Sequence, residues 1–179
     1  MASADVGHLA PSDHAEAIGQ FVIAWSELEH AADELIMRLG VLDESYGSIV
    51  LGHIDFRDKL AILRSLGFVK QPNDEWFAFL EKTVNQIDGV LRPFRNRIVH
   101  DAWSFTPTGR AFRVEREPKL LRPQAHERVL DTLRAKPTTP EDIVKGVKWA
   151  MFALGALSLL LEMPLASREA YPWEVLNWT

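Results

Sequence analysis

The sequence contains no cysteine among its 179 residues, which excludes disulfide bonds, a thiol nucleophile and any zinc site built on cysteine. Several enzyme motifs are also missing: H-E-x-x-H of zinc hydrolases, the P-loop G-x-x-x-x-G-K-[ST], G-x-S-x-G of serine hydrolases and G-x-G-x-x-G of dinucleotide enzymes. The sequence therefore gives no support to those enzyme classes, and we predict neither a cofactor nor a bound metal.

A secretory signal and a membrane-spanning run are also lacking. The segment Met1-Ala2-Ser3-Ala4-Asp5 does not combine a basic start with an apolar stretch, as a signal peptide would. A nearly apolar stretch over residues 149–161 has 13 residues, whereas crossing a membrane takes about 20. We therefore expect a cytoplasmic protein that binds no membrane. The composition, with 47% hydrophobic and 25% charged residues, is typical of a soluble domain, here one domain over residues 1–179.

Positive charge is scarce overall but is concentrated in one part of the chain. The net charge of −5 argues against a protein that coats nucleic acid. Residues 92–136, however, hold 11 Lys and Arg against 5 Asp and Glu, a local charge of +6, while the remainder carries −11. Two interpretations stay open: a basic face that attracts a polyanion, or a solvated arginine-rich hairpin.

Helical periodicity dominates the first part of the chain. Residues 12–40 carry apolar side chains at three- and four-residue steps, with Ser12 as the expected cap and Gly40 as the expected end. The members of this stripe are Ile18, Phe21, Val22, Trp25, Leu28, Ala32, Leu35, Ile36 and Leu39. Further helices are predicted after the capping residues Asp55 and Asn73, the first of them ending at Gly67.

The second part of the chain mixes two periodicities. Residues 104–116 alternate about a Pro-Thr-Gly turn and predict a β-hairpin, with Phe112 facing inward and Arg113 facing water. Thr139 starts a strongly signalled helix that runs to Glu162 and is apolar on all sides from residue 149, which predicts a place at the bundle centre or in a subunit interface. The predicted fold is all-α, an antiparallel helical bundle with a small β-hairpin inserted. Residues 1–11 are expected to be flexible, the tail 163–179 to be docked, and 117–139 gives no clear pattern.

Side chains suited to catalysis collect in residues 91–103, whose apolar positions fall near helical spacing. Asn96 and His100 are one helical turn apart, and the long side chain of Arg95 can reach His100. An amide one turn before a histidine can fix its tautomer, and arginine carries a planar fork suited to phosphate. Pro93 predicts either a kink between 89 and 93 or a new helix that begins at Pro93, and both leave the motif helical.

The order Arg95-Asn96-Arg97-Ile98-Val99-His100 resembles the R-N-x-x-x-H form of the R-x(4–6)-H signature of HEPN domains, which are helical proteins of prokaryotes and eukaryotes. The order of parts is similar too, with a long first helix and an aromatic residue soon after the histidine. Many HEPN proteins are metal-independent RNases, and others are binding or dimerising modules without activity. The resemblance implies a homodimer in which two motifs meet, an RNA substrate, no metal and a 2′,3′-cyclic phosphate product.

This resemblance assigns roles to the motif residues. His100 would move a proton, Arg95 would stabilise charge on the phosphate, and Asn96 would hold the imidazole. A toxin or defence role, with an antitoxin as partner, is the expected biological setting in bacteria. The alternative from another class is a non-catalytic dimeric helical module that binds a protein partner or a nucleotide.

Supporting roles are predicted for four more residues. Glu29 either extends to solvent or faces the Arg95 and His100 cluster. Arg92 and Arg97 are candidates for gripping RNA, but Arg97 can instead pair with Asp101 one turn on, and we favour that pairing.

Overall fold

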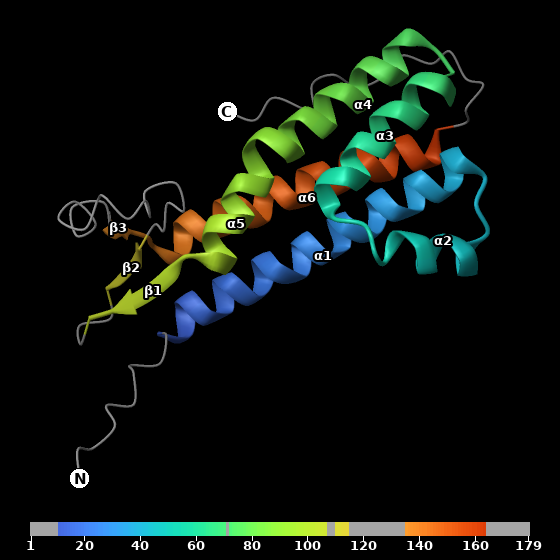
Figure 1. The fold of residues 1–179 in the computed structure, drawn as a ribbon. Helices are drawn as coiled ribbons and strands as arrows, with labels where there is room; N and C mark the ends of the chain where they lie inside the picture. Colours follow the sequence, from blue (N-terminus) through green and yellow to red (C-terminus); the bar gives the residue numbers. More distant parts are fainter. Residues whose placement is uncertain (1–10, 71, 107–109, 115–134, 164–179) are drawn as a thin grey trace, which may run out of the picture.

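The computed structural model describes residues 11–70, 72–106, 110–114 and 135–163, which are mostly helical with one small sheet (Figure 1). The helices are α1 (Ser12–Gly40), α2 (Glu44–Leu51), α3 (Phe56–Lys70), α4 (Asp74–Gln86), the π-helix η1 (Ile87–Leu91), α5 (Arg92–His100) and α6 (Pro140–Glu162). The strands β1 (Ala102–Phe105), β2 (Ala111–Val114) and β3 (Ala135–Pro137) form an antiparallel sheet in that order. The prediction of a helical protein with a small β element is confirmed. The expectations of a flexible start and a docked tail lie almost wholly outside the described residues.

The first and last of the described helices, α1 and α6, run side by side in the same direction (Figure 1). At one end the His14 Nε2 lies 3.0 Å from the Thr138 carbonyl oxygen, just before α6 begins. At the other end Arg38 Nη1 donates to the Leu160 carbonyl at 3.3 Å, and so binds an oxygen that the end of α6 leaves unpaired. The sequence predicts an antiparallel bundle. The structure differs in that α1 and α6 are parallel, so the bundle is not purely antiparallel.

The ends of α1 differ from the prediction in detail. Ser12 is the first helical residue rather than the cap, and its hydroxyl donates to Asp13. Val41, not Gly40, takes the left-handed conformation after the helix, with φ of 53°. Val22, expected on the buried stripe, is 46% exposed. The pattern therefore identified the helix, but neither its caps nor the edge of its apolar face.

The start of α6 is fixed by a capping box. The Thr139 Oγ1 accepts from the backbone N–H of Asp142, whose carboxylate accepts from the backbone N–H of Thr139. This backbone hydrogen bond is the main reason why the pKa of Asp142 is lowered. Among the described helices α6 alone is long and apolar enough to cross a membrane by length and composition, a test that core helices of soluble proteins also pass. Here it buries one face against its neighbours and leaves Met151 exposed, so it is not enclosed on all sides.

Gly146 lets α6 approach the motif helix closely. The Phe94 ring of α5 lies against it and makes edge contacts with Phe21 at 5.3 Å and Trp149 at 5.7 Å. A Cβ at Gly146 would overlap this ring. We expect Gly146→Ala to lower the free energy of unfolding by about 1–3 kcal/mol in urea denaturation, because the ring must move in a filled core. Gly155→Ala is the control: no described atom lies within 4 Å of the added Cβ, so stability should stay equal or rise by about 0.5–1 kcal/mol.

Gly67 does not end the third helix, as the sequence suggested, because α3 continues to Lys70. Gly67 is instead buried where α3 meets α4, and a Cβ there would overlap the side chain of Leu80. Glycine at a helix position can mark close packing as well as a helix end, and the sequence pattern did not separate the two.

The sheet begins earlier than the predicted hairpin and has a third strand, β3. Trp103, expected on the motif helix, lies in β1 directly opposite Arg113 of β2. Ala111 is 4% exposed, and the Arg113 side chain is 13% exposed. The prediction that Phe112 faces inward and Arg113 faces water is wrong, because the alternation of the strand is shifted by one residue. A part-buried arginine is stable here because it meets a carboxylate, as described below.

Candidate functional site

The motif helix α5 follows α4 through one widened turn rather than a break. In η1 the backbone N–H of Arg92 bonds to the Ile87 carbonyl, five residues earlier. Pro93 then lies in the first turn of α5, where its missing N–H costs little. The predicted irregularity before the motif is therefore present as a π-helical segment, a common cause of helix bending. The motif residues themselves are helical, as expected.

Arg95 and His100 contact each other directly. The distance from Arg95 Nη1 to His100 Nε2 is 3.0 Å, and the same nitrogen donates to Asn96 Oδ1 at 3.4 Å. A guanidinium only donates, so His100 Nε2 must be the acceptor and the ring proton sits on Nδ1. The prediction that Arg95 reaches His100 is confirmed. In this structure it is Arg95, and not Asn96, that contacts the imidazole and fixes its tautomer.

Two residues of α1 lie beneath the guanidinium of Arg95. Its Cζ is 5.8 Å from the centre of the Trp25 ring, within the range of a cation–π contact. The Trp25 Nε1 donates to Glu29 Oε1 at 2.7 Å, so Glu29 faces the cluster rather than extending away from it. Glu29 therefore positions Trp25, and Trp25 supports Arg95.

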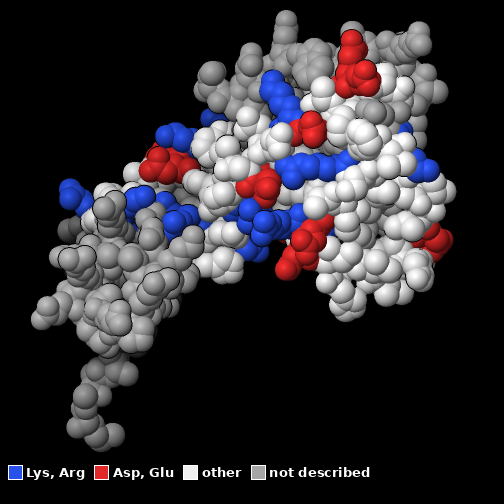
Figure 2. Space-filling view, turned by 45° about the horizontal axis from the view of Figure 1, so that its top comes forward, with Lys and Arg blue, Asp and Glu red and all other residues white. Residues whose placement is uncertain are grey.

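An open groove with a cavity of about 370 Å³ runs beside Arg95. It is lined by residues of α1, the start of α3 and α5: Trp25, Glu29, Asp55, Phe56, Arg57, Arg92, Arg95 and Asn96. Three of these side chains are cationic and two are anionic. Figure 2 shows Lys and Arg side chains in a band across one face of the molecule, with acidic side chains among them. The basic character expected of a nucleic-acid contact is therefore local and is partly offset by carboxylates.

The other two arginines of the motif segment are paired. Arg92 Nε donates to Asp88 Oδ1 at 2.7 Å, one turn earlier, while its side chain still lines the groove. Arg97 Nη1 lies 3.8 Å from Asp101 Oδ1, which confirms the pairing favoured from the sequence. Arg97 is thus held at the end of α5 and does not line the groove.

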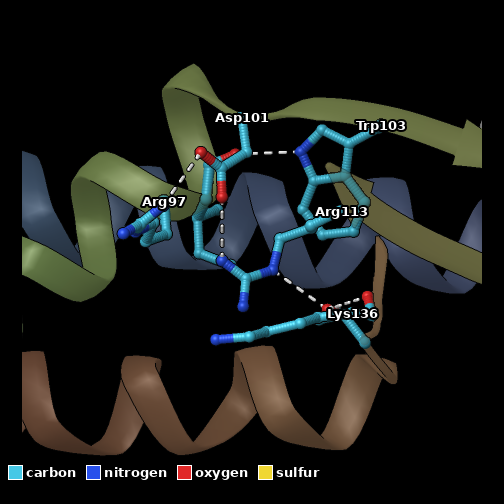
Figure 3. A network of polar contacts seen from close by, with 7 residues as sticks. Arg97, Asp101, Trp103, Arg113 and Lys136 are labelled. Carbon is cyan, nitrogen blue, oxygen red and sulfur yellow. Dashed lines mark hydrogen bonds and ion pairs between the residues drawn. The ribbon is translucent and has the colours of Figure 1, made fainter. Parts of the chain in front are cut away.

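Asp101 links the end of α5 to the sheet and, through it, to α6 (Figure 3). Its carboxylate receives Arg113 Nη1 at 3.4 Å, and Arg113 Nε donates to Thr138 Oγ1 at 2.9 Å. The Trp103 indole N–H donates to the Ile98 carbonyl at 3.0 Å. These contacts begin at the residue after His100, so they fix the end of the helix that carries the imidazole.

We expect this link to contribute strongly to stability, because the Asp101 side chain is only 7% exposed. Asp101→Asn should lower the free energy of unfolding by about 3 kcal/mol, since it leaves the Arg113 guanidinium, 13% exposed, without a carboxylate. Arg113→Gln should lower it by about 1–3 kcal/mol, because Asp101 keeps its pair with Arg97. Urea denaturation of both variants and of the double variant should give a coupling energy of about 0.5–3 kcal/mol. Lys145→Gln breaks an exposed pair with Asp142 and should lower the free energy of unfolding by less than about 1 kcal/mol. Additive effects of the first two changes would show that the pair is not coupled.

Sequence reasoning missed several residues of this site. The sequence pattern places Trp25 only in the core, does not distinguish Arg57, and predicts Arg113 in water. The available signal for Arg57 in the sequence is its place directly after Asp55 and Phe56, at a predicted helix start. Its proximity to the motif depends on how α3 crosses α1, which local periodicity does not specify.

In the described part of the chain no group of three or more His, Asp or Glu side chains is arranged to hold a metal ion. Comparisons with protein families, with curated proteins and with solved structures give no match for this chain.

Proposed function

We propose that this chain is a metal-independent endoribonuclease of HEPN type. The observation that carries the proposal is the contact between Arg95 and His100 at the side of an arginine-lined groove. A cation with a planar fork and an imidazole are two of the groups that RNA cleavage by its own 2′-hydroxyl uses. The family assignment depends on the short motif together with this geometry.

In the proposed reaction the phosphate draws Arg95 away from His100, because a charged oxygen is a better acceptor than imidazole nitrogen. The freed lone pair on His100 Nε2 takes the proton of the 2′-hydroxyl, and the 2′-oxygen attacks phosphorus. The bond from phosphorus to the 5′-oxygen breaks, and the leaving oxygen takes a proton from a second imidazole that enters the reaction in its protonated imidazolium form. The products are a 2′,3′-cyclic phosphate and a 5′-hydroxyl. Arg95 stabilises the added negative charge on the phosphate during the attack.

The second imidazole is proposed to come from a second copy of the chain. His100 is exposed, and so is Pro93, which lies seven residues earlier and therefore on the same face of the helix. Packing two copies together at this face would bury Pro93 and bring two Arg95 and His100 pairs to one phosphate. A cytoplasmic location, and an antitoxin that covers this face, belong to the same proposal.

A second candidate is a non-catalytic helical module that binds a protein or a nucleotide. It is favoured by the overall charge of −5 and by the pairing of Arg92 and Arg97 with acidic neighbours, which leaves fewer cations for a polyanion. Under this alternative the contact between Arg95 and His100 satisfies polar groups at the surface and performs no chemistry.

Incubation of the purified chain with end-labelled RNA in excess chelator separates the two candidates. The nuclease proposal predicts cleavage products that end in a 2′,3′-cyclic phosphate, identified by mass spectrometry. A variant that carries both Arg95→Ala and His100→Ala should give none. Equal RNA degradation by the parent chain and this variant would contradict the proposal and favour the binding module.

A further inference from the structure

The start of α3 supplies three different groups to the groove in three consecutive positions: Asp55, Phe56 and Arg57. Asp55 and Arg57 are exposed, and among the described residues neither side chain has a hydrogen-bond or ion-pair partner. Asp55 was expected to cap α3 with its carboxylate. Instead only its backbone carbonyl accepts bonds, from the N–H groups of Asp58 at 2.9 Å and Lys59 at 3.0 Å. Within the part of the chain that the structure describes, the carboxylate of Asp55 is therefore available to another partner.

Phe56 is held in place between these two charged residues. Its ring makes an edge contact with Trp25 at 5.0 Å, and Trp25 is the residue that lies beneath Arg95. The side chain is only partly buried, and it lines the groove. A fixed, part-exposed aromatic ring beside free charges is the arrangement on which proteins stack unpaired bases of single-stranded RNA.

We propose that this groove binds one nucleotide of the RNA, next to the phosphate held by Arg95, and that it prefers guanine. The base stacks on Phe56, its phosphate binds Arg57, and its Watson–Crick edge donates to the carboxylate of Asp55. Guanine is favoured because it alone among the RNA bases presents two adjacent N–H donors, N1–H and N2–H, which match the two oxygens of a carboxylate. This inference rests on the proposed function for the identity of its ligand as RNA.

The size and charge of the groove agree with such a ligand. A cavity of about 370 Å³ lies in the range that holds small ligands, and its three arginines exceed its two carboxylates by one charge. Of the three arginines, Arg92 is held by Asp88 and Arg95 by His100 and Asn96, so Arg57 is the one without a described partner. A phosphate at Arg57 therefore breaks no hydrogen bond or ion pair within the described residues.

The test measures binding to the full chain carrying His100→Ala, so that the RNA is not consumed. Isothermal titration with 5′-GMP, AMP, CMP and UMP should show GMP binding at least tenfold more tightly than the others. A labelled RNA tetramer with one guanine should bind more tightly than an all-uridine tetramer by a similar factor. Asp55→Asn should remove the preference for guanine, whereas Arg57→Gln should weaken the binding of all four nucleotides to a similar extent. Lys148→Gln is the charge-matched control, because Lys148 is an exposed cation of α6 outside the groove. It should change neither the affinity for nucleotides nor the preference for guanine.

Equal affinity for the four nucleotides, or a guanine preference that survives Asp55→Asn, would overturn the proposal. So would binding of GMP without any preference for the guanine-containing RNA, since the site would then serve a free nucleotide. Because binding is measured without cleavage, each of these three failures leaves the nuclease proposal standing. Conversely, an inactive parent chain that still shows the guanine preference would end only the nuclease proposal.

Discussion

Replacing His100 by alanine is expected to lower the rate of RNA cleavage by about 10²–10⁴-fold, the usual contribution of a general acid or base. The reason is specific to its geometry: Nε2 already faces the guanidinium that would hold the phosphate, at 3.0 Å. The loss should appear in kcat, with little change in KM, because the imidazole acts on the proton in transit and not on the bound RNA. Single-turnover cleavage of a labelled oligonucleotide measures it directly.

The matched control for this change is His30→Ala on α1. His30 is also exposed, and among the described residues its one polar contact is to Glu34 Oε1, 3.4 Å away on the same helix. It should keep full activity, and both variants should keep the helical circular dichroism of the parent chain, because neither side chain is buried. A His100→Ala protein that is folded and retains most of its activity would remove His100 from the reaction.

Replacing Arg95 by lysine is expected to lower kcat by about 10²–10³-fold even though the positive charge is kept. Arg95 stacks on Trp25 while one of its nitrogens reaches both Asn96 and His100, and an ammonium group lacks the planar fork for this arrangement. If Arg95 were only a surface charge that attracts RNA, Arg95→Lys would leave kcat unchanged and any loss of activity would appear as a higher KM. The comparison of kcat with KM therefore separates a role in the transition state from general attraction.

Arg64→Lys is the control for the arginine change, because Arg64 is an arginine of α3 that donates to Asn85 outside the groove. We expect no measurable effect on cleavage. Trp25→Phe should reproduce part of the Arg95→Lys defect, since the ring face is kept but the hydrogen bond to Glu29 at 2.7 Å is lost. A normal rate in Trp25→Phe would show that Glu29 does not support the site.

The helices could be predicted because local rules determine them. Asn73 and Thr139 each cap a helix with a side chain, as their sequence contexts predict, whereas Asp55 at the start of α3 uses only its backbone carbonyl. The apolar stripe of residues 12–40 is buried along most of its length. Gly67 misled because glycine serves both at helix ends and at close helix contacts. The direction of α6 relative to α1 depends on long-range packing, which no local pattern encodes.

The site was predictable only in part for a related reason. Arg95 and His100 are five residues apart on one helix, so their contact follows from helical geometry and a long side chain. Asp55, Phe56 and Arg57 enter the groove from α3, and Arg113 enters the end of α5 from β2. The alternation of residues in β2 does not show which face is inward, because an arginine can face inward when it pairs with a carboxylate there, as Arg113 does with Asp101.

The most direct test of the central claim uses an RNA oligonucleotide whose cleavage position has been mapped and which carries a single 2′-deoxy nucleotide 5′ to that bond. In chelator, the account predicts that cleavage at this bond stops, while an oligonucleotide with the 2′-deoxy nucleotide placed elsewhere is cut normally. The attacking oxygen would then be that of the RNA itself, with Arg95 and His100 providing charge and proton transfer. Cleavage of the modified bond at the normal rate would contradict the account, because water would have to be the nucleophile.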